Sequence, residues 1–163
     1  MIRSVLFLLL SILLLTCEEN TPRSNIPYAP VSFTLQLDSY DNILNNPLTY
    51  KVYTETDQRL PTDRFGYSGL LVVTSANGDA IYAYDLCCPY EADKSIKVFP
   101  RNDGRSECKN CGSVFITIYG NRIAGLGMIG LGSPESGPAA TSRLSLRSYS
   151  VTPLQFGEYR IFN

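Results

Sequence analysis

Two short stretches, CCPY at residues 87–90 and CKNCGS at residues 108–113, carry most of the information about the fold. They contain four of the five cysteines in the chain, and the chain has no histidine. Two cysteine stretches at this spacing are typical of small β-proteins that hold a metal ion or join two loops by disulfides. The missing histidine excludes Ser-His-Asp and Cys-His nucleophilic sites and histidine-ligated zinc hydrolases. No other catalytic constellation is visible, so we expect a protein that is not an enzyme.

The sequence around these stretches predicts an all-β domain. Residues 31–38 alternate apolar and polar side chains, which is the pattern of a half-buried strand. Asn77-Gly78 is a strong hairpin signal, because both residues tolerate positive φ. After Cys17, no window of eleven or more residues keeps a helical period. We expect further strands at residues 49–54, 69–74, 80–84, 114–119, 144–151 and 158–162.

The combination of these features resembles the Rieske iron–sulfur family. In that family a C-x-H loop and a C-x-x-H loop hold a [2Fe–2S] cluster, one iron on two cysteines and the other on two histidines. Here a hairpin runs into the first stretch, an apolar strand leaves the second, and Gly137-Pro138-Ala139 precedes the closing strand. The resemblance covers about residues 69–151, with residues 31–54 as outer strands. It implies an antiparallel β-sandwich with two adjacent cysteine loops.

The ligands depart from the family pattern. The resemblance places Cys88 and Cys108 on the two cysteine positions, but Tyr90 and Cys111 stand where the histidines would be. A phenol with a pKa near 10 is a poor metal ligand until it loses its proton. The resemblance therefore implies that a standard Rieske cluster is excluded. Asp85, just before the first stretch, is expected to cap a turn at the end of a strand.

Three interpretations of the thiols remain open. Disulfides among Cys87, Cys88, Cys108 and Cys111 would staple the two loops, and this is favoured in an oxidising compartment. Alternatively, Cys88, Cys108 and Cys111 hold zinc or an atypical [2Fe–2S] cluster. Cys87 is the weaker fourth ligand, because adjacent side chains diverge in an extended backbone. A redox-active dithiol of Cys108 and Cys111 is the weakest interpretation, because a strand rather than a helix follows it.

The N-terminal residues predict export and a lipid anchor. Residues 1–16 read as a signal peptide with Arg3 followed by a short apolar run. The sequence LLTC at residues 14–17 resembles a bacterial lipobox, so Cys17 is expected to be lipidated; an ordinary signal peptide or an uncleaved anchor is the alternative. The acidic residues that follow Cys17 resemble surface-export signals of Bacteroidetes lipoproteins. These features predict a lipoprotein of the cell envelope and outer membrane, exposed at the surface.

The rest of the chain divides into a tether at residues 17–30 and one β domain at residues 31–163. The charge is nearly balanced, with 14 basic and 15 acidic residues and no basic block, so nucleic acid is not an expected partner. The membrane, through the lipid, and an envelope protein are the expected partners. We favour a binding or structural module with disulfide-stapled loops. The alternative is an electron-transfer protein that carries an atypical cluster or a cysteine-ligated zinc.

Overall fold

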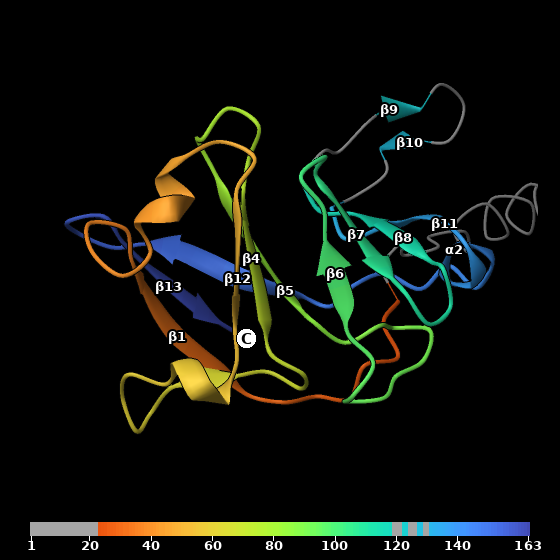
Figure 1. Cartoon of the computed structure of the whole chain (residues 1–163), viewed down its shortest axis with the longest axis horizontal. Helices are drawn as coiled ribbons and strands as arrows, with labels where there is room; N and C mark the ends of the chain where they lie inside the picture. The colour runs from red at the N-terminus through yellow and green to blue at the C-terminus, as the bar shows by residue number, and fades with distance from the viewer. Residues whose placement is uncertain (1–22, 119–121, 124–126, 129–130) are drawn as a thin grey trace, which may run out of the picture.

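The structure is a computed structural model that describes residues 23–118, 122–123, 127–128 and 131–163 (Figure 1). The predicted signal peptide, Cys17 and the first part of the tether lie outside the described residues. Within the described ranges, no helix is both long enough and apolar enough to cross a membrane.

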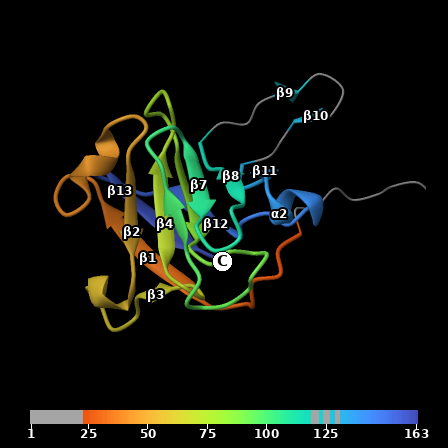
Figure 2. The ribbon, with the colours of Figure 1, turned by 45° about the vertical axis from the view of Figure 1, so that its right-hand side comes forward.

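The larger of the sheets has seven strands and is antiparallel throughout. Phe33 in β1 and Tyr53 in β2 have ring centroids 4.8 Å apart although four strands separate β1 from β2 in the sheet order. The sheet is therefore curled into a nearly closed barrel whose edge strands are β2 and β3 (Figure 2). Its strands, in sheet order, are β2 (Tyr50–Tyr53), β4 (Leu70–Thr74), β5 (Ile81–Asp85), β12 (Ser148–Pro153), β13 (Glu158–Phe162), β1 (Val31–Gln36) and β3 (Arg64–Phe65).

A smaller, four-stranded antiparallel sheet carries the second cysteine stretch (Figure 1). Cys108 is the last residue of β7 and pairs with Val98 in β6. The strands, in sheet order, are β11 (Pro134–Ser136), β8 (Val114–Ile116), β7 (Arg105–Cys108) and β6 (Val98–Pro100). The remaining elements are the 3₁₀ helices η1 (Asn42–Asn45) and η2 (Glu55–Asp57), the short helix α2 (Pro138–Thr141), and the strand pair β9 (Arg122–Ile123) and β10 (Gly127–Met128).

The predicted all-β class is confirmed, and so is most of the local pattern. Strand β1 buries alternate residues, with Phe33 and Leu35 fully buried. The β4–β5 hairpin turns through Gly78 at φ 75°, as the Asn-Gly signal predicts. One strand prediction is wrong: Leu144 and Leu146 are buried but precede β12, which begins at Ser148.

Strand β4 separates two hydrophobic cores. Leu70 and Val72 face the core inside the curled sheet, whereas Leu71 and Val73 face a second core against the smaller sheet. All five residues of β4 are buried, which explains its unbroken apolar sequence. The second core also contains Cys88 and Cys108, so the cysteine loops are packed between the two sheets rather than hanging into solvent.

The smaller sheet is topologically an insertion in the larger one. Strands β5 and β12 pair directly, with Tyr84 opposite Ser148. The Asp85 N–H donates to the Arg147 carbonyl at 2.9 Å. Residues 86–147, which include both cysteine stretches, therefore leave and rejoin the larger sheet at neighbouring positions.

Candidate metal centre

Three thiols from the two cysteine stretches converge on one point. The sulfur atoms of Cys88, Cys108 and Cys111 all lie within 4.8 Å of one another. The Sγ atoms of Cys88 and Cys111 are 3.7 Å apart. Cys88 and Cys108 are fully buried, and Cys111 is partly exposed. The two stretches are therefore neighbours in space, as predicted.

The first loop is held by backbone hydrogen bonds on both sides of Cys88. The Cys88 N–H donates to the Ile96 carbonyl at 3.0 Å, and the Ala92 N–H donates to the Cys88 carbonyl at 2.9 Å. Cys87 forms an antiparallel bridge with Lys97. The loop returns to its starting point within ten residues, so the position of Cys88 is fixed by main-chain contacts rather than by its side chain.

The second loop is a tight turn between β7 and β8. The Cys108 N–H donates to the Ser113 carbonyl at 2.9 Å, and the Gly112 N–H donates to the Cys108 carbonyl at 2.8 Å. Gly112 takes φ 71°, a conformation that favours glycine. The turn places Cys111 beside Cys108.

A third segment supports this turn from outside. The Ala139 N–H donates to the Ser113 hydroxyl at 3.0 Å, and Ser113 is fully buried. A Cβ at Gly137 would lie only 2.7 Å from the Ser113 Cα, so the two backbones approach too closely for any other residue. The Gly-Pro-Ala run is the one signal of this contact in the sequence, and nothing there points to Ser113.

The thiols differ in how readily they ionise. Burial raises the pKa of Cys88 well above its ordinary value, although the backbone N–H groups of Glu91 and Tyr90 offset part of this effect. Burial also opposes ionisation of Cys111, but hydrogen bonds from Ser113 and from the neighbouring thiols outweigh it and lower its pKa. The Cys111 thiol donates to the Ser113 Oγ at 3.1 Å, and the hydroxyl can donate in return once the sulfur is ionised. Cys111 is thus better prepared than Cys88 to meet a cation.

Cys87 faces away from the other three sulfurs. Its thiol lies 3.3 Å from the Asp93 carbonyl and 3.5 Å from the Cys88 carbonyl. Burial raises the pKa of Cys87 to about 11. The predicted divergence of the adjacent side chains is confirmed. Tyr90, at the other altered position, is 44% exposed.

The disulfide arrangement that the sequence favoured is not formed, since all four of these cysteines are free thiols. A disulfide needs an S–S distance of about 2.05 Å, far below the 3.7 Å between Cys88 and Cys111. Two disulfides would also require a sulfur partner for Cys87, whose thiol faces carbonyl groups instead. The sulfurs converge as a group of three rather than as pairs.

The group of three fits a single metal ion. A tetrahedral zinc with Zn–S bonds of about 2.3 Å places two sulfur ligands about 3.8 Å apart. The observed 3.7 Å between Cys88 and Cys111 agrees with that separation. Cys108 needs only a small movement to satisfy it as well, because its sulfur already lies within 4.8 Å of both.

Asp85 fixes the entry to the first loop. Its buried carboxylate accepts from the N–H groups of Tyr67 at 2.6 Å and Cys87 at 2.8 Å, and from the Tyr149 hydroxyl at 2.7 Å. It also accepts from the Ser68 N–H at 3.2 Å. The expected turn-capping role is confirmed, and Asp85 is not among the groups close enough to share a metal with the three thiols.

No family model, curated protein or solved structure matches this chain.

Proposed function

We propose that this chain is a non-catalytic, envelope-anchored β module in which one zinc ion, held by Cys88, Cys108 and Cys111, staples the two cysteine loops. The observation that carries the proposal is the convergence of three sulfurs from two loops within 4.8 Å. Thiolates are preferred zinc ligands, and a structural zinc contributes directly to folding stability. The ion would tie the two loops together, as a disulfide does in other small β domains.

A single zinc accounts for the donor set better than an iron–sulfur cluster does. A [2Fe–2S] cluster needs four protein ligands, two on each iron. Cys87 is turned toward the Asp93 carbonyl, and the other three sulfurs are grouped too closely to divide between two irons. The resemblance to the Rieske family then concerns the arrangement of the loops and not the cluster.

The surrounding groups prepare the thiols for a cation. Ser113 stabilises the thiolate of Cys111, and backbone N–H groups of Tyr90 and Glu91 do the same for Cys88. When bound, zinc supplies the positive charge that makes ionisation of the buried thiols favourable. Three protein ligands leave one tetrahedral position for water or for a ligand from an envelope partner.

A second candidate for the staple is a Cys88–Cys111 disulfide. The 3.7 Å between their sulfurs is close enough for oxidation to join them after a small movement of the loops. The role in the protein would be the same, because either bond ties the first loop to the second. We also propose that Cys17 is lipidated, which requires export of the chain. Export places the thiols in an oxidising compartment, where a disulfide can form.

Metal analysis of the full-length chain, purified without added metal and again after zinc reconstitution, tests the proposal. We expect one zinc per chain, lost in Cys111→Ser and retained in the matched control Cys87→Ser. Stoichiometric iron with visible absorption would instead support the electron-transfer alternative. If the chain takes up neither metal and non-reducing mass spectrometry finds a Cys88–Cys111 disulfide, the staple is the disulfide and not zinc.

A further inference from the structure

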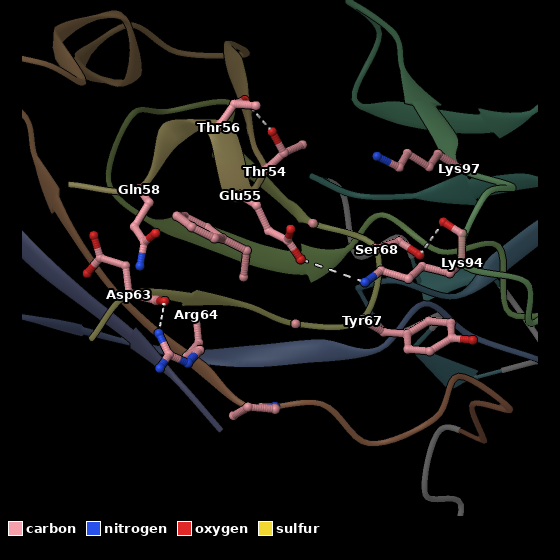
Figure 3. Close-up of a pocket in the computed structure, with 14 residues that line it drawn as sticks. Thr54, Glu55, Thr56, Gln58, Asp63, Arg64, Tyr67, Ser68, Lys94 and Lys97 are labelled. Atoms are coloured by element: carbon pink, nitrogen blue, oxygen red, sulfur yellow. Dashed lines mark hydrogen bonds and ion pairs between the residues drawn. The ribbon is translucent and has the colours of Figure 1, made fainter. Parts of the chain in front are cut away.

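A cavity of about 610 Å³ lies on the larger sheet, beside the first cysteine loop but separate from the three thiols (Figure 3). Its walls come from three places in the chain. One wall follows β2 and contains η2, a second is β3 with residues 66–69, and the third is formed by Lys94 and Lys97 from the loop after Cys88. The volume is in the range of about 300–1,000 Å³ that is usual for small-molecule sites.

Lys97 brings an unmatched positive charge to this cavity. Its side chain is half-buried, and it forms no ion pair with any residue in the described part of the chain. Figure 3 shows its ammonium group extended toward the wall that carries Thr54 and Thr56. The backbone of Lys97 is fixed by its bridge with Cys87, so the side chain starts from a rigid position. An ammonium group without a counter-ion on a cavity wall favours an anionic ligand.

Lys94 is available to the same ligand. It pairs with Glu55 at 3.7 Å across the cavity (Figure 3), and both side chains are largely exposed, at 64% and 89%. Such exposed ion pairs contribute little to stability, so a ligand can displace Glu55 from Lys94 at small cost.

The other acidic residue in the lining, Asp63, is held in a turn away from the lysines (Figure 3). The Asp63 carboxylate accepts from the N–H groups of Arg59 at 2.9 Å and Leu60 at 2.8 Å and is committed to that turn. Arg64 in turn donates to the carbonyls of Pro61 and Asp63. With Arg64, Lys94 and Lys97 against Glu55 and Asp63, the lining carries a net charge of +1, and Glu55 is its loosely paired acid.

Neutral polar side chains lie on the wall opposite the lysines (Figure 3). The Gln58 side chain is exposed on the same wall, and its amide can both donate and accept. The hydroxyl of Thr56 forms a hydrogen bond with that of Thr54, at 2.8 Å. Paired donors and acceptors of this kind suit the hydroxyl groups of a ligand.

We propose that this cavity binds a small hydroxylated carboxylate, the chemistry of an acidic sugar. Lys97 holds the carboxylate, Lys94 exchanges Glu55 for the ligand, and Thr56 on the opposite wall bonds a hydroxyl group. The site is independent of the zinc proposal, because none of its lining residues is one of the three thiols.

Isothermal titration of the full-length chain with glucuronate, succinate and glucose tests the proposal. Glucuronate carries both chemical features, succinate only carboxylates and glucose only hydroxyls. We expect glucuronate to bind more tightly than either. Binding by none of the three, or equal binding of glucose or succinate, would overturn the assignment.

Two substitutions should move the glucuronate affinity in opposite directions. Lys97→Met should weaken binding about tenfold or more, the usual effect of losing a charged hydrogen-bond partner. Glu55→Gln should strengthen it several-fold, because it frees Lys94. The matched control is Lys109→Gln, whose ammonium lies 4.5 Å from the Phe99 ring, outside the lining of the cavity. Unchanged affinity in Lys97→Met, with circular dichroism showing a folded chain, would refute the site.

Discussion

Replacing Gly137 by alanine should damage the cysteine loops through a segment that contains no cysteine. The added Cβ would lie 2.7 Å from the Ser113 Cα and 3.0 Å from the Gly112 carbonyl oxygen. Both atoms belong to the backbone and cannot rotate away. The turn that carries Cys111 must therefore shift, and with it the hydrogen bond from Ala139 to the Ser113 hydroxyl.

The expected cost has two parts. Gly137 has φ 83°, and a side chain in that region costs about 1–2 kcal/mol. Forcing an extra methyl group into a packed contact costs about 1–3 kcal/mol more. Gly112→Ala is the matched control, because Gly112 lies on the turn that carries Cys111 and has φ 71°, but its Cβ would meet nothing within 4 Å. It should lose only the first part.

Urea unfolding in the presence of excess zinc and again with a chelator measures both effects. Gly137→Ala should be less stable than Gly112→Ala by at least about 1 kcal/mol. Its zinc affinity should also fall relative to the control, because the displaced turn carries Cys108 and Cys111. Equal free energies of unfolding for the two variants would refute the reasoning from close backbone approach.

Three further predictions concern the anchor, the metal and the larger sheet. Cys17→Ser should move the protein from the membrane to the soluble fraction, and unchanged fractionation would contradict lipidation. Zinc affinity, measured against a competing chelator, should rise steeply from about pH 6 to about pH 8, because the thiols must lose protons to bind. A flat profile would argue against thiolate ligands. Asp41→Asn should destabilise the fold by about 3–5 kcal/mol at neutral pH in urea unfolding, since it breaks a buried ion pair in which the carboxylate accepts from Arg59 at 2.7 and 2.9 Å. Burial alone would raise the pKa of Asp41, but the hydrogen bonds from Arg59, Gln36, Lys51 and Tyr53 lower it, so this stability is present above the unfolded pKa of about 3.9. The difference between wild type and variant should therefore shrink as the pH falls below about 4.

The sequence was most informative where the pattern is local. Alternation in residues 31–36 reports a strand with one buried face, and Asn-Gly reports a turn with positive φ; both are present as β1 and the β4–β5 hairpin. The divergence of Cys87 from Cys88 also follows from local geometry alone. These features depend on neighbours along the chain, which the sequence displays directly.

The sequence was least informative where distant segments determine the outcome. Leu144 and Leu146 are apolar because they pack into the second core. Their alternate spacing resembles that of a strand, although they do not form one. Strands β6 and β7 are short and include Pro100 and Arg105, so neither shows a clear alternation. The choice between paired and grouped sulfurs depends on how the two cysteine loops meet. The cavity depends on lysines from a loop that is distant in sequence from its other walls.

Because β5 and β12 pair directly, residues 86–147 form an excursion whose two ends are adjacent. In connectivity, this segment is a cassette: a short turn could close the larger sheet without it, and it could be transplanted between two neighbouring antiparallel strands of another protein. Its removal or transfer has a cost in free energy, because its apolar side packs against the larger sheet. Leu71, Val73 and Tyr84 of the larger sheet form one side of the second core, and removing the cassette would expose them to water. A host for the cassette would need an apolar patch of the same kind, and a shortened version of this chain would need polar replacements at those three positions.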